Sequence, residues 1–454
     1  MDAGMMDVSD FEQEYFPTLN PAGREMLKFL REHPAAPIYR NRSGNRLLAE
    51  EIEELRAFER EVRDAEIGWP HGGAPQWRDA FVARTYEEVP YFRQMGSPPR
   101  RFEDIPTTCR ADLAADIARF VPDPVSPERL ICFQTTGTTG HPLRVPSHPL
   151  VAGRYLAFHK RALRRFGIEP RHGRGEVGVV LLGMQKKCFT YVSVTPVMDD
   201  SGLAKINLHP DDWRDPDDRV RYLDALRPEI IAGDPISFAE LLTLSLAIRP
   251  RALLCVGMAL LSGLRQLLEE RFACPVLDLY SMNEAGPVGV FDAAAGGHVL
   301  LQHRLFVEIL DPAGQPVAEG ERGEITFTGG FNFCLPLLRY RSGDFATLSR
   351  HGIEPVLSGL CGREPVRFRS RNGGWINNID VTHALQSLPL HQFGLHQNAD
   401  GSLVLRLGRG GMPFAEAAAG LLRPLFGDQP VAVEEIATEG KILQYTSDLD
   451  QTPA

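Results

Sequence analysis

A run of threonines and glycines is the stretch of this sequence whose residue types most directly suggest chemistry. The segment FQTTGTTGHPLRV covers residues 133–145, with four threonines and two glycines packed between positions 135 and 140. Glycine weakens helices and strands, and threonine is stiff at χ1, so the composition indicates a loop. Such a loop offers backbone N–H groups and hydroxyls to a ligand rich in oxygen atoms, for which a phosphate is the first candidate. The alternative is a surface turn. The segment is also not a Walker loop, since no Gly-Lys-Ser/Thr follows, so the phosphate hypothesis needs support from elsewhere in the chain.

Three later stretches hold reactive side chains at unusual positions. They are LYSMNEAGPVG (279–289), with a tyrosine and a glutamate, LLRYRSGDF (337–345), with an aspartate on a glycine turn, and EGKILQY (439–445), with one lysine beside a glycine. Ligands of open α/β sheets bind beyond the carboxyl ends of the strands, which is where the first stretch falls. Taken singly, the three side chains have ordinary alternatives, namely a solvated glutamate, a turn aspartate and a solvated lysine near the C-terminus.

The elements that must position these stretches alternate between strands and helices. Unbroken apolar runs separated by helical segments indicate a buried, largely parallel sheet. The predicted strands are 177–183, 229–233, 252–257 and 275–280, and the predicted helices are 50–66, 237–248 and 258–272.

The second half of the sequence has a different character. Residues 298–348 alternate strands and turns, which predicts a β-rich subdomain, and residues after 362 predict a strand (403–407), a helix (413–426) and a strand (431–434). The predicted fold is therefore α/β, with a large N-terminal domain of mixed sheets flanked by helices, plus the β-rich subdomain, and a small mobile α+β C-terminal domain. The expected domains are 1–361 and 362–454.

The overall composition excludes several classes of protein. The chain has 454 residues and a net charge of −10 without a basic block, which argues against nucleic acid or an anionic membrane as partner. Seven scattered cysteines with no C-x-x-C pair predict neither a disulfide framework nor a zinc cluster. The N-terminus is acidic, unlike a secretory signal, and the most apolar stretch (252–264) is too short to span a bilayer. We expect a cytoplasmic protein.

The order of the motifs is more specific than any one of them. A Thr/Gly loop is followed by Tyr-Ser-Met-Asn-Glu, Tyr-Arg-Ser-Gly-Asp, Gly-Arg and Gly-Lys-Ile-Leu between about residues 130 and 445. This series resembles the adenylate-forming (AMP-binding) superfamily of acyl-CoA synthetases and ligases. The segment RPEIIAGDPISFAELL (227–242) and the compact length are most similar to the phenylacetate–CoA ligase branch.

The resemblance implies a nucleotide site. Tyr280 would lie against the adenine, Asp344 would accept hydrogen bonds from the ribose hydroxyls, and Arg363 would lie near the ribose and phosphate. The residues that would surround the ATP phosphates are Thr135, Thr136, Gly137, Thr138, Thr139 and Gly140.

The resemblance also implies the catalytic residues. Asn283 would contact the α-phosphate, Glu284 would hold Mg²⁺, and Lys441 on the small domain would bridge the carboxylate and the α-phosphate. The chemistry requires such groups, because a carboxylate attacks phosphorus in a site crowded with negative oxygens, and cations and N–H donors must neutralise the developing charge. The implied reaction is ATP-dependent formation of an acyl-adenylate, followed by transfer to CoA as a thioester.

Two further functions stay open from the sequence. One is an adenylating enzyme that passes the acyl group to an amine or a carrier protein, and the other is a nucleotide-binding module without catalysis. Intact Glu284, Asp344 and Lys441 count against the second, since a pure binding protein has no need of a lysine on a mobile domain.

The expected acyl pocket has an apolar character, which favours an aryl or other apolar acid. Thr190 stands where relatives that activate amino acids hold an aspartate for the α-ammonium, which argues against an α-amino acid. The expected pocket residues come from four segments and are Phe189, Thr190, Tyr191, Gly233, Gly257, Met258 and Met282. The apolar ones have an equal alternative as ordinary core residues, and the sequence does not identify the acid.

Three positions depart from the pattern of the family. Leu143 and Arg144 follow the loop proline where the family often has lysine, so one cation is missing or displaced. The segment FDAAAGGHV (291–299) lacks the cysteines of a zinc cluster, so no zinc is expected. Pro365 stands in the hinge, where its fixed φ predicts either that rotation moves to Asn372–Gly374 or that the adenylating pose is favoured.

Overall fold

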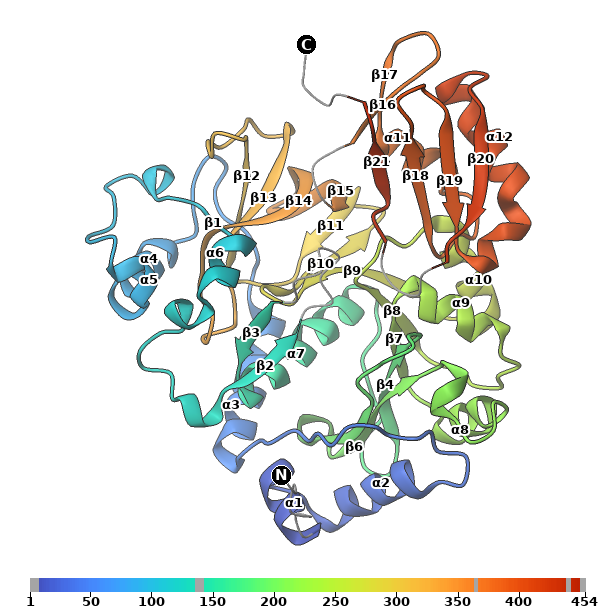
Figure 1. Ribbon diagram of the computed structural model, residues 1–454. Helices are drawn as coiled ribbons and strands as arrows, with labels where there is room; N and C mark the ends of the chain where they lie inside the picture. Colours follow the sequence, from blue (N-terminus) through green and yellow to red (C-terminus); the bar gives the residue numbers. More distant parts are fainter. Residues whose placement is uncertain (1–7, 135–142, 363–365, 438–441, 450–454) are drawn as a thin grey trace. The chain divides into compact units, whose positions relative to one another are not determined.

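The structure is a computed structural model that describes residues 8–134, 143–362, 366–437 and 442–449. The chain forms two compact units (Figure 1). Unit 1 comprises Met1–Asn20, Gly44–Pro170 and Leu279–Glu364, and unit 2 comprises Pro21–Ser43, Arg171–Asp278 and Pro365–Ala454. The predicted division at 361/362 adjoins residues 363–365, which lie outside the described ranges, and it stays a prediction.

Unit 1 is built on antiparallel strands. Their order is β12-β13-β14-β15-β11-β10-β9, and the short β1 pairs in parallel with β14. The strands are β1 (Thr108–Cys109), β9 (Val276–Met282), β10 (Gly286–Asp292), β11 (Gly297–Leu300), β12 (Leu305–Leu310), β13 (Arg322–Gly329), β14 (Leu337–His351) and β15 (Glu354–Gly362). The β-rich character expected for residues 298–348 is confirmed, since four of these strands lie wholly or largely within that stretch.

Helices and a two-stranded ribbon complete unit 1. Helix α3 (Ala49–Asp64) buries Ile52, Leu55 and Val62 at helical spacing, and it packs on α7 (Pro149–Arg165), which packs on β10. The other elements are α1 (Val8–Tyr15), α4 (Arg78–Glu88), α5 (Pro90–Arg93), α6 (Arg110–Ala115), β2 (Ile131–Gln134), β3 (Arg144–Ser147) and the 3₁₀ turns Phe102–Asp104, Ile117–Phe120 and Pro127–Arg129.

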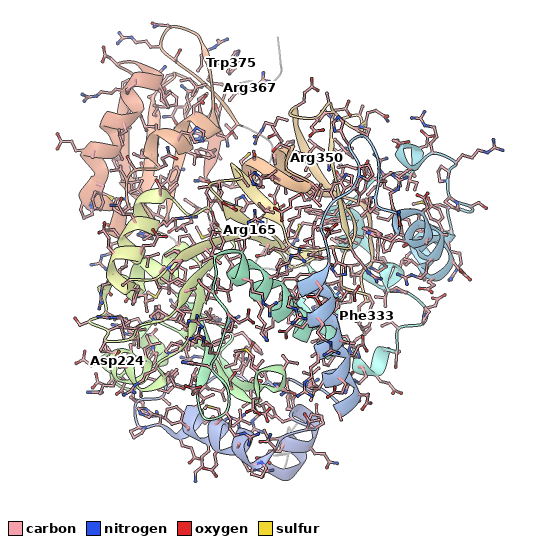
Figure 2. All side chains as sticks on the ribbon, turned by 180° about the vertical axis from the view of Figure 1, so that it is seen from behind. Arg165, Asp224, Phe333, Arg350, Arg367 and Trp375 are labelled. Carbon is pink, nitrogen blue, oxygen red and sulfur yellow. The ribbon has the colours of Figure 1, made fainter. Side chains whose placement is uncertain are left out.

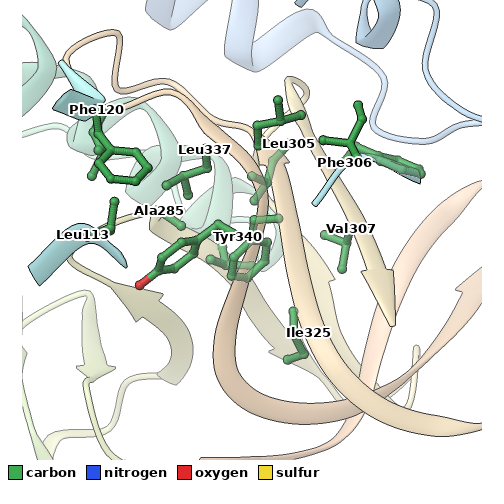
Figure 3. Close-up of a cluster of buried hydrophobic side chains, with 14 of the residues drawn as sticks. Leu113, Phe120, Ala285, Leu305, Phe306, Val307, Ile325, Leu337 and Tyr340 are labelled. Carbon is green, nitrogen blue, oxygen red and sulfur yellow. The ribbon is translucent and has the colours of Figure 1, made fainter. Parts of the chain in front are cut away.

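The core of unit 1 joins these helices to the β-rich strands. Figure 3 shows Tyr340 among Leu113, Ala285 and Leu337, with its hydroxyl at the margin of the cluster. Tyr340 is only 1% exposed, so its ring is part of the core while its oxygen needs a polar partner.

Unit 2 contains the parallel strands that the apolar runs predict. Strands β8, β7, β4 and β6 pair in parallel, and β5 closes the edge in antiparallel fashion. The strands are β4 (Val177–Gly183), β5 (Tyr191–Thr195), β6 (Ser201–Asn207), β7 (Ile230–Gly233) and β8 (Ala252–Val256), with 3₁₀ turns at Pro196–Met198 and Pro210–Asp212. The helices beside them are α2 (Pro21–Glu32), α8 (Asp218–Leu226), α9 (Pro235–Thr243) and α10 (Ser262–Phe272).

Two predicted helices of unit 2 are shorter than expected. Helix α9 ends at Thr243 rather than at 248, because the chain then runs alongside α8 and the Ala247 N–H donates to Asp224 at 2.8 Å. Helix α10 begins at Ser262 rather than at 258, because Gly257 adopts a left-handed φ of +79° and the chain turns before the helix can start.

The C-terminal part of unit 2 has its own sheet, with strand order β20-β19-β18-β21. Figure 2 shows Arg367 and Trp375 on the hairpin β16–β17 beside it. The elements are β16 (Arg367–Arg369), β17 (Trp375–Asn377), α11 (Asn378–Leu385), β18 (Phe393–Gln397), β19 (Leu403–Leu407), α12 (Ala415–Phe426), β20 (Val431–Glu435) and β21 (Tyr445–Ser447). The predicted helix 413–426 is α-helical only from Ala415, and a 3₁₀ segment, Arg409–Phe414, precedes it.

No helix within the described ranges is both long and apolar enough to cross a membrane.

Candidate adenylation site

Tyr280 and Asp344 meet in unit 1, as the resemblance implied for two residues of one nucleotide site. The Tyr280 hydroxyl donates a hydrogen bond to Asp344 Oδ2 at 2.7 Å. Their strands, β9 and β14, are four steps apart in the strand order, about 19 Å in a flat sheet, which two such side chains cannot bridge. This part of the sheet must therefore curl, and the curl brings the two motifs together.

The local structure around Asp344 corrects the predicted glycine turn. Residues 342–344 stand opposite the single residue Ile325 of β13, so β14 continues through a bulge instead of turning. Gly343 supplies the left-handed φ of +79° that the bulge needs. The Ser342 hydroxyl donates to the Ile325 carbonyl at 2.8 Å, and the Asp344 N–H donates to the Ser342 oxygen at 3.0 Å. The bulge fixes the direction of the Asp344 side chain.

Glu284 is a buried carboxylate with two partners in unit 1. Its side chain is 5% exposed, and its Oε1 accepts from an Arg110 Nη at 3.1 Å and from the Tyr340 hydroxyl at 3.3 Å. Burying a carboxylate costs free energy unless the group is paired and hydrogen-bonded, and these two partners offset that cost. Arg110 begins α6 and is a residue that the sequence reasoning missed, because nothing in its surroundings marks it and it lies 174 positions from Glu284.

The cation that the family often has after the loop was expected to be missing or displaced in this chain, and Arg110 supplies a cation near Glu284. Leu143 is 4% exposed and packed in the core, and Arg144 is an exposed residue of β3. The cation that the structure places beside Glu284 is therefore supplied by α6.

The two acids are held in a reciprocal way. Tyr280 of β9 holds Asp344 of β14, and Tyr340 of β14 holds Glu284, which follows β9. In each motif a tyrosine stands four residues before an acid, and that tyrosine donates a hydrogen bond to the acid of the other motif. We call these four residues the tyrosine clasp.

Burial dominates the electrostatics of the clasp. It raises the pKa of Tyr280 well above its usual value, and the negative charge of Asp344 raises it further. Burial also raises the pKa of the Tyr340 hydroxyl, and the charge of Glu284 adds to that. The pKa of Tyr155 rises to about 12 for the same two reasons, burial first and then Glu284. Tyr280 and Tyr340 therefore stay protonated and donate to the two acids.

The neighbours of the clasp differ in exposure. Asn283 is exposed at the end of β9, and Met282 is partly buried against the core of unit 1. His298 is 8% exposed, with its ring 6.4 Å from that of Tyr280 and 5.5 Å from that of Phe291. Within the described ranges no three His, Cys, Asp or Glu side chains gather as metal ligands.

The remaining predicted acyl-pocket residues lie in unit 2. Phe189 is 50% exposed, with its ring 5.6 Å from that of Tyr191, so Phe189 is not a core residue. Gly233 ends β7, and Gly257 and Met258 follow β8, the strand paired with β7. These positions lie at the carboxyl ends of neighbouring parallel strands, where ligands of such sheets bind.

Thr190 has a structural task of its own. Its side chain is fully buried, and its Oγ1 accepts from the Arg40 N–H at 3.1 Å. Its N–H donates to Asn41 Oδ1 at 3.0 Å. Within this geometry the hydroxyl already has a partner, and its predicted place in the pocket stays a prediction.

The other predicted residues fall outside the described ranges. They are Thr135, Thr136, Gly137, Thr138, Thr139 and Gly140 of the loop, Arg363 of the hinge, and Lys441.

Comparison with known proteins decides the family. A family model described as AMP-binding enzyme matches residues 97–333, which is just over half of the chain and includes the loop, the predicted acyl segments and Glu284. The chain belongs to the AMP-binding enzyme family. The resemblance deduced from the motif order is thereby confirmed.

Individual relatives of this AMP-binding enzyme point to one branch. Phenylacetate-coenzyme A ligase of Thermus thermophilus is 27% identical over 317 residues, which cover 63% of the chain and 66% of that relative. Phenylacetate-coenzyme A ligase of Escherichia coli is 33% identical over 90 residues, which cover 19% of the chain and 21% of that relative. The chain thus spans just under two thirds of the length of the first of these relatives and about a fifth of the second.

Solved structures confirm the predicted fold class. A 2-hydroxyisobutyryl-CoA ligase in the postadenylation state, in complex with R3-HIB-AMP, matches with a TM-score of 0.59 and 17% identity, covering 87% of this chain and 90% of that one. An open conformation of a 2-hydroxyisobutyryl-CoA ligase matches with a TM-score of 0.53, covering 84% of this chain and 92% of that one. The AMP-binding enzyme described here is thus a mixed α/β protein with a separate small C-terminal sheet.

Proposed function

We propose that this AMP-binding enzyme is an AMP-forming acid–CoA ligase. It activates a carboxylic acid with ATP to an acyl-adenylate and then transfers the acyl group to the thiol of CoA. The observation that carries the proposal is the tyrosine clasp, which brings the acids of two distant motifs together in a family of AMP-binding enzymes. The names of the phenylacetate-coenzyme A ligases to which the chain is similar support the choice of CoA as acceptor.

The first half-reaction makes a mixed anhydride. A carboxylate oxygen of the acid attacks the α-phosphorus of ATP, the new O–P bond forms, and the bond to the bridging oxygen breaks so that pyrophosphate leaves. Asp344 would hold the ribose through its carboxylate oxygens, since an ionised carboxylate accepts several hydrogen bonds at once. Lys441 would balance the charge that develops between the acid and the α-phosphate, and Asn283 would contact that phosphate.

Glu284 is the proposed protein ligand of Mg²⁺. Mg²⁺ is usually bound by one or two carboxylates together with phosphate oxygens and water, so a single buried glutamate at a phosphate site fits. Both contacts described above, from Arg110 and Tyr340, fall on Oε1 of Glu284. When bound, the cation would neutralise phosphate oxygens. Arg110, beside the same carboxylate, would add a second positive charge facing the phosphates.

The second half-reaction moves the acyl group. The sulfur of CoA attacks the acyl carbon, the C–S bond forms, the bond to the AMP oxygen breaks, and the thiol proton passes to solvent. An amine or the thiol of a carrier protein would react at the same carbon, so these acceptors are the alternatives that the experiment must separate.

An apolar, aryl-bearing acid is the proposed substrate class. The exposed Phe189 ring beside Tyr191 supports it, because ligand pockets are lined mainly by apolar and aromatic side chains. Met258 and Met282 would add adaptable apolar surface.

A reducing compartment suits the chain, so we propose that the enzyme works in the cytoplasm. None of the seven cysteines, all of which lie within the described ranges, forms a disulfide bond, which supports this placement.

Acid-dependent exchange of pyrophosphate into ATP tests the first step. A panel of aryl, alkyl and amino acids is assayed with purified protein, and the adenylate formed is then trapped with CoA or with hydroxylamine. Exchange that depends on an aryl or alkyl acid, followed by thioester formation with CoA, is the expected result. Exchange without CoA consumption would favour the amine or carrier-protein acceptor, and no exchange with any acid would contradict the proposal.

A further inference from the structure

The N-terminus of α10 receives its cap from the C-terminal part of unit 2. Leu261 precedes the helix and offers no side-chain cap, although the first N–H groups of a helix need acceptors. The Gly263 N–H donates to the Gln386 carbonyl at 2.9 Å, and the Ser262 hydroxyl donates to the same oxygen at 2.7 Å. Gln386 directly follows α11, so a helix end that is rich in carbonyls meets one that is rich in N–H groups.

The absence of a side chain at residue 263 makes this contact possible. A Cβ at that position would lie 2.5 Å from the carbonyl carbon of Leu388 and 2.6 Å from the carbonyl oxygens of Leu388 and Ser387. These are backbone atoms, which cannot swing aside as the end of a flexible side chain can. Any residue larger than glycine must push the segment 386–388 away from α10.

The contact combines a buried residue with a solvated edge. Leu261 is 4% exposed and belongs to the core cluster of the C-terminal sheet, together with Leu390 and Phe393. Ser262 and Gln386 are exposed, so water can replace both hydrogen bonds when the segment leaves. A contact of this kind is strong enough to favour one arrangement and weak enough to be reversible.

The same C-terminal segment also includes His391, whose pKa is affected by a residue at the end of β7. Burial lowers the pKa of His391, and the negative charge of Asp234 raises it. Asp234 follows Gly233 at the end of β7 and caps α9 by accepting from the Ser237 N–H at 2.8 Å. Residues 386–391 thus contact the start of α10 and include a side chain that senses the charge of Asp234, the residue after the predicted acyl-pocket Gly233.

The resemblance to the adenylate-forming superfamily implies that the small domain takes one position for adenylation and another for thioester formation. We propose that Leu261, Ser262 and Gly263 form a seat that holds the C-terminal segment in one of these two positions. Gly263 is the positioning residue of this α10 seat, acting through the segment 386–388 rather than by touching the substrate. The inference rests on the proposed two-step function and adds to it the contact that sets the balance between the steps.

Gly263→Ala tests the seat in the full-length protein. Two rates are measured, acid-dependent pyrophosphate exchange and single-turnover transfer from preformed acyl-adenylate to CoA. The ratio of the two rates should shift by about tenfold, because one added methyl displaces one arrangement only. Gly420→Ala is the matched control, since a Cβ at that position in α12 has no heavy atom within 4 Å. Ser262→Ala should shift the ratio in the same direction, and Ser262→Thr, which keeps the hydroxyl, should restore it.

The outcomes separate the inference from the proposed function. Equal changes in both rates, or no change, would overturn the seat, since a general folding defect slows both steps alike. Amide hydrogen exchange gives a readout that needs no activity, and Gly263→Ala should accelerate exchange in residues 386–391. Unchanged exchange there would also overturn it. A wild-type protein that activates no acid would contradict the proposed function instead, and amide exchange would still decide the seat.

Discussion

Asp344→Asn is the substitution that most directly examines the proposed ribose contact. Asparagine has nearly the same shape, and its amide oxygen can keep the hydrogen bond from Tyr280, so the clasp should persist. The second carboxylate oxygen becomes an NH₂ group, which cannot accept from a ribose hydroxyl. A hydrogen bond to a charged group contributes about 1.5–3 kcal/mol, so KM for ATP should rise about 10- to 150-fold. We expect kcat to change little, since the ribose contact is the same in the ground and transition states.

The assay is pyrophosphate exchange with ATP, 2′-deoxy-ATP and 3′-deoxy-ATP, in wild type and in Asp344→Asn. Wild type should lose affinity for the deoxy nucleotides, whereas the variant should lose little more, because its partner is already gone. Tyr280→Phe is the control, since it leaves both oxygens of Asp344 in place. Equal penalties for the deoxy nucleotides in wild type and Asp344→Asn would refute the ribose contact.

The remaining predictions concern charge. Lys441→Ala should nearly abolish acid-dependent exchange with a large fall in kcat and a small rise in KM, and exchange within about tenfold of wild type would exclude this lysine from the adenylation step. Arg110→Met should weaken ATP binding by about tenfold, seen by calorimetry, because the cation beside Glu284 is lost; unchanged affinity would restrict Arg110 to holding that carboxylate. Burial raises the pKa of the Glu308 carboxyl to about 7, although the Arg339 guanidinium lies 3.4 Å away. At a pH between the unfolded and folded pKa values, the folded chain therefore keeps a proton on Glu308 that the unfolded chain has released. The free energy of unfolding should therefore fall between about pH 5 and pH 8, and Glu308→Gln should remove that slope in urea titrations.

The sequence predicts those parts of the site that depend on local pattern. Unbroken apolar runs located β4, β7, β8 and β9, and the residues after them lie at the strand ends where they were expected. The sequence did not predict Arg110, because its place beside Glu284 depends on packing between segments far apart in the chain. The bulge at Asp344 was missed for a related reason, since a glycine in a strand satisfies a turn and a bulge equally well.

Helix ends show the same limit. The apolar spacing of 237–248 continues past Thr243, yet the backbone leaves the helix there, because the Ala247 N–H finds a partner in Asp224 of the neighbouring α8. The backbone N–H can bond within the helix or to a neighbouring element, and here the outcome depends on a residue 23 positions away in the sequence.

The hairpin β16–β17 contains the residues that were expected to replace Pro365 as the hinge. One expectation was that the small C-terminal domain rotates about Asn372–Gly374, because Pro365 stiffens the usual pivot. These residues form the turn of the hairpin, closed by a bond from the Ser370 N–H to the Gly374 carbonyl at 2.8 Å. Rotation there would open the hairpin without turning the rest of the C-terminal sheet, so the structure does not support a pivot at this turn.

The tyrosine clasp has a consequence for the pH–rate profile of the enzyme. Both phenols are buried, each faces a carboxylate, and the pKa of each lies above that of an ordinary tyrosine. Neither Tyr280 nor Tyr340 therefore releases its proton in the neutral or mildly alkaline range, and the positions of Asp344 and Glu284 stay fixed there. A decline of adenylation on the alkaline side must then originate in another group, and the role proposed for Lys441 makes its amine the first group to test by substitution.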